Sequence, residues 1–96
     1  MNCMSFESVH NYHEAAVFQW IGDEAYRYPT LAGRADLLAD VACVALNRMP
    51  PRYVLNDLDT AFYMDAATLA QQLAAVREAV EFAFKFVQAR TNRESR

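Results

Sequence analysis

Two arginines and a tyrosine flank a pair of adjacent prolines in the stretch from Arg48 to Tyr53. The fork of donors on a guanidinium suits phosphate oxygens and the Hoogsteen edge of guanine. A planar guanidinium or a tyrosine ring can also stack on a base. Two prolines stiffen the bend, which lowers the entropy lost on binding. The pattern predicts a binding corner for a small phosphate ligand with flat bases, formed by Arg48, Arg52 and Tyr53.

A structural interpretation of the same corner stays open. In it, Arg48 satisfies free carbonyls at the end of a helix and Tyr53 belongs to the core. Asn47 precedes this corner, and its amide is expected to hold the next segment in place by bonding backbone groups. A direct role of Asn47 in reading a ligand is the secondary interpretation.

No arrangement of residues predicts catalysis. A hydrolase needs a nucleophile beside a base, but the three serines lie near the two ends of the chain, outside any elbow motif. Cys43 falls in an apolar segment and is expected to be a buried, inert thiol. Two glycines are too few for a glycine-rich phosphate loop. We therefore expect a protein that is not an enzyme and that has no cofactor.

His10 and His13 are three residues apart and could face the same way, with Cys3 or Glu14 as further zinc ligands. Two histidines at this spacing need two more partners, and no pair of cysteines stands nearby. We therefore expect no metal site.

Helical periodicity predicts a mainly α domain of three helices, near residues 5–27, 34–49 and 66–89. Ser5 and Asp65 are the expected N-caps of the first and last helices. The expected core face of the last helix repeats at steps of three and four and consists of Leu69, Leu73, Val76, Val80, Phe84 and Val87. Residues 50–64 show no helical pattern and are expected to form an ordered loop, compatible with one short strand or hairpin. The tail, residues 90–96, is basic and polar and is expected to be flexible.

The central helix is apolar over most of its surface. Between Leu37 and Met49, the strongly polar residues are Asp40, Asn47 and Arg48. A helix of this kind is typical of the inside of a bundle, so we expect it to be buried on nearly all sides.

The 96 residues are expected to form one domain, 1–96. Apolar residues make up 54% of the chain, and Phe82, Phe84 and Phe86 cannot share one narrow stripe of a helix. This surplus predicts a homodimer. The net charge of −3 argues against general nucleic-acid binding. The chain has no run of about 20 apolar residues and no signal peptide at its start, so we expect a cytoplasmic protein away from membranes.

The stretch around the corner resembles the late competence development protein ComFB family. The matching residues are Asp40, Val41, Ala45, Leu46, Asn47, Arg48, Pro50, Pro51 and Tyr53, with a weaker upstream match at Asn11, Glu14 and Val17. The resemblance implies a small, helical, dimer-forming regulatory domain, and some members of the family are receptors for cyclic dinucleotides, cyclic di-GMP in particular. Some relatives carry a zinc-binding cysteine cluster ahead of the central helix; here that region, residues 31–37, contains no cysteine.

Two functions are therefore carried forward. The first is a regulatory domain that binds a cyclic dinucleotide as a homodimer and signals through a protein partner. The second is a homodimer that only binds proteins and has no nucleotide ligand.

Overall fold

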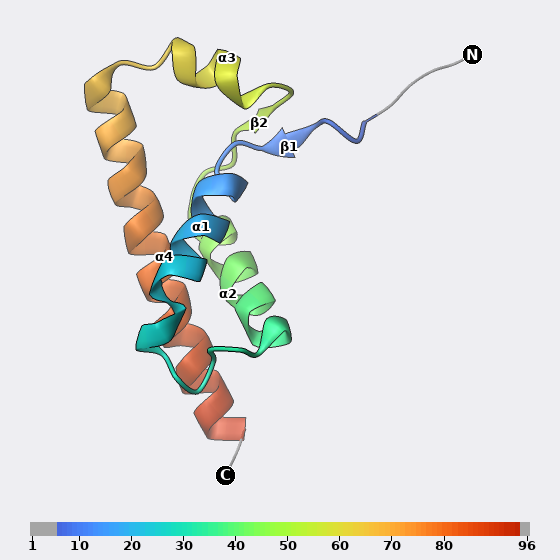
Figure 1. Ribbon diagram of the computed structural model, residues 1–96, viewed down its shortest axis with the longest axis vertical. Helices are drawn as coiled ribbons and strands as arrows, with labels where there is room; N and C mark the ends of the chain where they lie inside the picture. Colours follow the sequence, from blue (N-terminus) through green and yellow to red (C-terminus); the bar gives the residue numbers. More distant parts are fainter. Residues whose placement is uncertain (1–5, 95–96) are drawn as a thin grey trace.

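The computed structural model describes residues 6–94. Within this range the chain is mainly α-helical, with a small two-stranded antiparallel sheet, as the sequence predicts. In Figure 1, α1, α2 and the later turns of α4 lie side by side, while the first turns of α4 extend past them toward α3. The elements in chain order are β1 (His10–Asn11), α1 (Glu14–Glu24), the 3-10 helix η1 (Ala25–Arg27), α2 (Ala35–Arg48), β2 (Tyr53–Val54), α3 (Asp57–Phe62) and α4 (Ala66–Glu94).

The core lies where α1, α2 and α4 meet. The ring of Phe84 is fully buried and stacks on Tyr28, with the ring centroids 4.3 Å apart. Phe82 and Phe86 remain partly exposed, which confirms that the three rings do not share the core. The buried apolar residues are Val17, Ile21, Leu31, Val41, Ala45, Met49, Val76, Ala79, Val80, Ala83, Phe84 and Val87.

The prediction that the central helix is buried on nearly all sides is wrong. α2 buries one face, where Val41 and Ala45 have no exposed surface. Cys43 is exposed, so the expected buried thiol is wrong as well. α2 is exposed on its outer side because only α1 and α4 pack against it, both on the same side, among the described elements.

The first helix begins at Glu14, well after the predicted start, and its predicted cap, Ser5, lies outside the described residues. The apolar spacing continues upstream, but β1 pairs with β2 there, with His10 opposite Val54 and Asn11 opposite Tyr53. The helical pattern was therefore overridden by pairing with a segment about 40 residues away.

The loop after α2 contains the expected short strand, β2, and also a helix that the sequence analysis missed. α3 begins after Asn56, whose side-chain oxygen accepts a hydrogen bond from the Leu58 N–H at 2.9 Å. Asp57 and Asp59 lie in its first turn, where negative charge is favourable. The same polar residues signal a turn and a helix start, and α3 is too short to show a periodic pattern.

Asp65 caps α4 as predicted, because its carboxylate accepts a hydrogen bond from the Thr68 N–H at 2.7 Å. The helix does not end near Ala89, as the sequence predicts, but continues to Glu94. Arg90 in the last turns pairs with Asp40 of α2 at 3.0 Å. Among the described residues, none of the helices combines the length and the apolar character needed to cross a membrane.

Candidate functional site

Arg52 lies in the bend between α2 and β2, and hydrogen bonds hold both its backbone N–H and its backbone carbonyl. Its N–H donates to the side-chain oxygen of Asn11 at 3.2 Å, and its carbonyl accepts from the Tyr12 N–H at 2.6 Å. The side chain of Asn11 is almost fully buried, and the same oxygen also accepts from the His13 N–H at 3.2 Å. One amide oxygen therefore joins the start of α1 to the Pro-Pro segment and fixes the position of Arg52.

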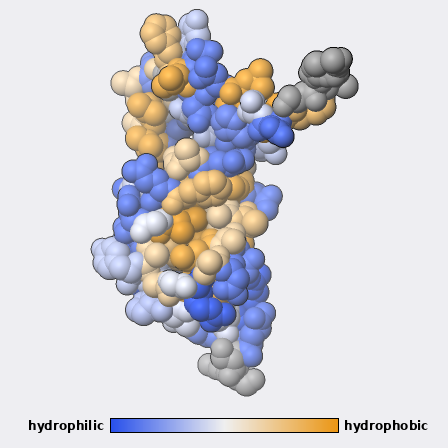
Figure 2. Space-filling view, turned by 45° about the vertical axis from the view of Figure 1, so that its right-hand side comes forward, coloured by the Kyte–Doolittle hydropathy of each residue, from blue (hydrophilic) through white to orange (hydrophobic). Residues whose placement is uncertain are grey.

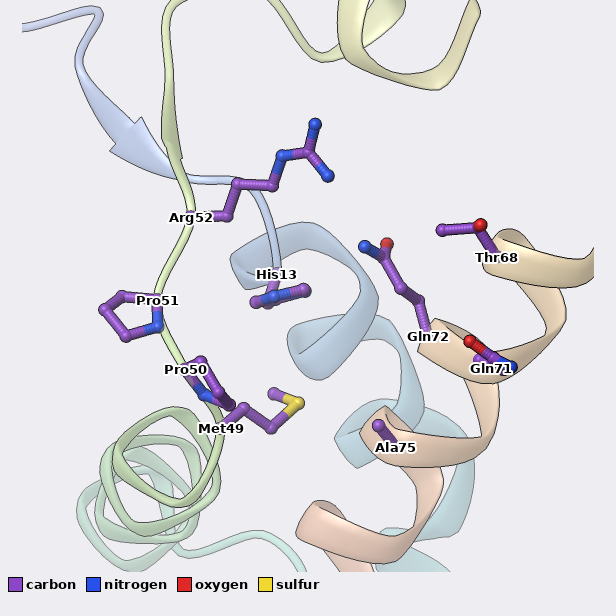
Figure 3. A pocket seen from close by; sticks show the side chains of 9 residues that line it. All are labelled: His13, Met49, Pro50, Pro51, Arg52, Thr68, Gln71, Gln72 and Ala75. Atoms are coloured by element: carbon purple, nitrogen blue, oxygen red, sulfur yellow. The ribbon is translucent and has the colours of Figure 1, made fainter. Parts of the chain in front are cut away.

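A cavity of about 440 Å³ opens between this bend and the early turns of α4. In Figure 3, the Arg52 side chain extends from the bend toward α4, Gln72 extends from α4 toward it, and the His13 ring lies between the two elements. This volume falls in the range of about 300–1,000 Å³ that is typical of small-molecule sites. The lining residues are His13, Met49, Pro50, Pro51, Arg52, Thr68, Gln71, Gln72 and Ala75.

The charges around the cavity favour an anion. Among the described residues that line it, Arg52 alone carries a permanent charge. Partial burial lowers the pKa of the His13 imidazole below its usual value, and the Arg52 guanidinium lowers it further, against the opposing effect of the Pro50 carbonyl. His13 is therefore mainly neutral near pH 7. The cavity combines one cation with hydroxyl and amide groups that can bond an oxyanion or the edge of a base.

The structure places Arg48 beside this cavity and not in its wall. Its guanidinium carbon lies 3.7 Å from the centroid of the Phe82 ring, a cation–π contact. It lines a neighbouring hollow that also contains Glu78 and that shares Met49, Pro50 and Ala75 with the Arg52 cavity. The two arginines therefore lie on either side of Pro50.

The remaining two predicted site residues lie away from the cavity. Tyr53 belongs to β2 with 67% of its surface exposed, and it is neither core nor part of the cavity wall. The Asn47 side-chain amide donates to the carbonyl of Cys43, one turn back in the same helix, at 2.9 Å. The expectation that Asn47 holds the following segment is wrong, and Asn11 has that role.

Sequence reasoning missed the α4 wall of the cavity. Thr68, Gln71, Gln72 and Ala75 recur at steps of three and four, so they share one face of α4. The first turns of α4 are otherwise apolar, so a face with uncharged polar residues there could have indicated these positions. The signal was weak because residues of this kind are also common on solvated surfaces.

His10 and His13 do not converge. His10 Nε2 lies 2.6 Å from a carboxylate oxygen of Asp57 on α3, and its Nδ1 lies 2.7 Å from the Ser8 carbonyl. His13 instead faces the Arg52 cavity. Their spacing in sequence therefore reflects two separate structural positions.

A family model for the late competence development protein ComFB matches residues 10–91, most of the chain. The chain belongs to the ComFB family. No curated protein and no solved structure shows significant similarity to it. The match includes β1, α1, the bend between α2 and β2, and nearly all of α4, so it covers the elements that build the Arg52 cavity.

The upstream residues that carry the ComFB resemblance have structural tasks in this chain. Asn11 fixes the bend, and a carboxylate oxygen of Glu14 accepts a hydrogen bond from the Asn11 N–H at 3.2 Å. Val17 is fully buried in the core. The Asn11 oxygen accepts from the His13 N–H and the Glu14 carboxylate accepts from the Asn11 N–H, so both side chains bond backbone N–H groups just ahead of α1. The N-x-x-E-x-x-V pattern of this ComFB domain thus serves to position Arg52.

Proposed function

We propose that this ComFB-family chain is a non-enzymatic regulatory domain that binds a cyclic dinucleotide in the Arg52 cavity. Cyclic di-GMP is the first candidate ligand, and the domain would act as a homodimer that signals through a protein partner. One observation carries the proposal: the Arg52 side chain lines a cavity of small-molecule size, and hydrogen bonds hold both the N–H and the carbonyl of its backbone. Family membership supports the class of ligand.

The chemistry of the cavity suits such a ligand. A cyclic dinucleotide carries two phosphate charges and two flat bases. Arg52 can pair with a phosphate or with the Hoogsteen edge of guanine. The side chains of Gln71, Gln72 and Thr68 offer donors and acceptors for base edges. These groups stand on a helix and on a bend that contains two prolines, which lowers the ordering required on binding.

Arg48 has a secondary place in the proposal. Its guanidinium is engaged by the Phe82 ring, and Glu78 lines the same hollow. It can contact only the part of a ligand that reaches past Pro50. We therefore expect a smaller effect from Arg48→Ala than from Arg52→Ala.

Isothermal titration calorimetry with cyclic di-GMP and cyclic di-AMP tests the proposal. Losing one Arg–phosphate or Arg–base contact costs roughly 1–3 kcal/mol, so Arg52→Ala should weaken cyclic di-GMP binding about tenfold to a hundredfold. Arg77→Ala is the matched control, because Arg77 lies on α4 but lines a separate cavity beside Trp20 and Glu24. Binding of neither nucleotide, or equal losses for Arg52→Ala and Arg77→Ala, would refute the assignment.

A homodimer that only binds proteins is the second candidate. It is favoured by the hollow of about 560 Å³ between α1 and α2, whose lining is apolar throughout and includes Phe18, Leu38 and Cys43. In Figure 2, orange hydrophobic surface lies over this part of the molecule. Failure of both nucleotides in calorimetry, together with a stable dimer, would leave this candidate.

A further inference from the structure

The Arg52 cavity adjoins a second cavity of about 240 Å³, which lies between α1, α3 and the early turns of α4. We call this second cavity the α3 groove. His13 and Gln72 line both cavities, so these two residues stand at their junction, and Figure 3 shows the Gln72 side chain extending from α4 toward the bend. Sites for whole drug-sized ligands measure about 300–1,000 Å³. The α3 groove alone is therefore too small for a dinucleotide, but it can take one base of a ligand that also occupies the Arg52 cavity.

The walls of the α3 groove are mainly apolar. Leu58 of α3 lies on one side and Leu69 and Leu73 of α4 lie on the other, and all three keep exposed surface in the structure. Figure 2 shows hydrophobic surface at the end of the molecule that carries α3 and the start of α4. A flat base between side chains of this kind removes apolar surface from water on both of its faces. The groove therefore suits the face of a base.

One carboxylate gives the α3 groove its polarity. Apart from His13, which is mainly neutral near pH 7, Asp57 is the one charged residue among the described residues that line it. Asp57 Oδ1 lies 2.6 Å from His10 Nε2. A carboxylate has about four acceptor sites, so both of its oxygens keep lone pairs for a ligand. With a cation in one cavity and an anion in the next, a nucleotide is oriented with its phosphate at Arg52 and a hydrogen-bond donor at Asp57.

Guanine has the polar edge that fits this groove. Its Watson–Crick edge presents the O6 acceptor, the N1–H donor and the 2-amino donor in that order. The Gln72 amide can donate to O6, and the Asp57 carboxylate can accept from N1–H and from the amino group. Adenine presents a lone pair at N1 where guanine presents a donor, so the carboxylate disfavours it.

We infer that the α3 groove is a base subsite in which Asp57 and Gln72 select guanine over adenine, while Arg52 holds the adjoining phosphate. This inference rests on the proposed function, because it requires a cyclic dinucleotide in the Arg52 cavity. It deepens that function by naming the residues that decide between cyclic di-GMP and cyclic di-AMP. The second base of the ligand stays in the Arg52 cavity, beside Thr68 and Gln71.

Isothermal titration calorimetry on the full chain with three cyclic dinucleotides tests the subsite. Cyclic di-IMP is the decisive probe, because its bases keep O6 and N1–H and lack only the 2-amino group. The side chain of Asp57 is 45% exposed, so the loss of one hydrogen bond to it is expected to have an effect at the low end of the usual range. The wild-type protein should bind cyclic di-IMP about tenfold more weakly than cyclic di-GMP, and cyclic di-AMP more weakly still.

The variant Asp57→Asn should remove this preference. An asparagine amide offers a single acceptor oxygen and places an NH₂ group where guanine needs a second acceptor. The affinity ratio of cyclic di-GMP to cyclic di-IMP should therefore fall to about one. Cyclic di-AMP should gain relative to cyclic di-GMP, because the amide N–H can donate to adenine N1. A merely looser α3 would instead weaken all three nucleotides alike and leave the ratios unchanged.

Two matched variants control for charge and for the position of α3. Asp59→Asn removes the same charge from the same helix, but Asp59 lines neither cavity, so both ratios should stay at their wild-type values. His10→Gln removes the ion pair with Asp57 and leaves the carboxylate in place, so it should keep the preference for guanine.

The outcomes separate this inference from the proposed function. Cyclic di-GMP binding that depends on Arg52, with the same ratio to cyclic di-IMP in Asp57→Asn as in the wild type, would uphold the Arg52 cavity and overturn the base subsite. A loss of preference in Asp59→Asn or His10→Gln as large as that in Asp57→Asn would overturn it too, because the preference would then come from charge or from the docking of α3. Failure of all three nucleotides to bind would refute both proposals.

Discussion

Replacement of Asn11 by alanine should destabilise the fold and weaken ligand binding, although Asn11 does not line the cavity. Its side-chain oxygen accepts hydrogen bonds from the N–H groups of Arg52 and His13. Loss of the acceptor for a buried donor costs about 1–3 kcal/mol. Because both bonds are only part-buried, we take the low end for each and expect a loss of about 2 kcal/mol in the free energy of unfolding.

Urea unfolding followed by circular dichroism measures this loss, with Asn47→Ala as the matched control. The Asn47 amide bonds only a carbonyl of its own helix, so its replacement by a good helix former should change stability by less than about 0.5 kcal/mol. The Asn11 variant should also bind cyclic di-GMP more weakly, because Arg52 is no longer held. Equal stability of the two variants would refute the assignment of Asn11 as the residue that fixes the bend.

Two further predictions concern α3 and the core. Both ring nitrogens of His10 face acceptors, and the Ser8 carbonyl first, then Asp57 with a smaller effect of Glu14, raise its pKa above the usual 6.5 against partial desolvation. The stabilisation of α3 by protonated His10 is therefore complete below about pH 6.5 and is lost as the pH rises through the raised pKa. After correction for intrinsic exchange, the rate of amide exchange in α3 should increase with pH in the wild type and should increase less in His10→Gln. Phe84→Ala should lower the free energy of unfolding by about 3–5 kcal/mol in urea denaturation, because the ring is fully buried against Tyr28, whereas Phe82→Ala on the partly exposed face should cost clearly less.

The sequence allowed prediction of the parts of the fold that depend on local pattern. Steps of three and four from Val76 to Val87 located the buried face of α4, and Asp65 located its start. The paired prolines located the end of α2. In each case the residues that carry the signal are also the residues that make the contact.

Features that depend on distant partners were not predictable in the same way. The start of α1 at Glu14 is set by the pairing of β1 with β2, which no local spacing indicates. Exposure of Cys43 depends on how many helices cover α2, and composition does not give that number. Leu69 and Leu73 continue the spacing of the core residues of α4, but α1 and α3 cover them only in part, and they are 42% and 52% exposed.

For the candidate site, the sequence drew attention to Arg52 but gave no information on its surroundings. The two arginines on either side of the prolines suggested a cation at a rigid bend, and the structure gives Arg52 a cavity at that bend. His13 and Gln72 come from parts of the sequence far from the bend, so only the packing of α1 and α4 brings them there. Arg48 was expected to share the site but instead contacts Phe82, because the helical position of Arg48 directs it to the other side of Pro50.

The amide NMR spectrum of the protein, recorded during titration with cyclic di-GMP, tests the central claim most directly. The account predicts shifts that cluster at Arg52, Thr68, Gln71 and Gln72, including the side-chain amides of the two glutamines, and that are absent in Arg52→Ala at the same nucleotide concentration. Shifts centred instead on Phe18 and Leu38, or a spectrum unchanged by saturating nucleotide, would contradict it.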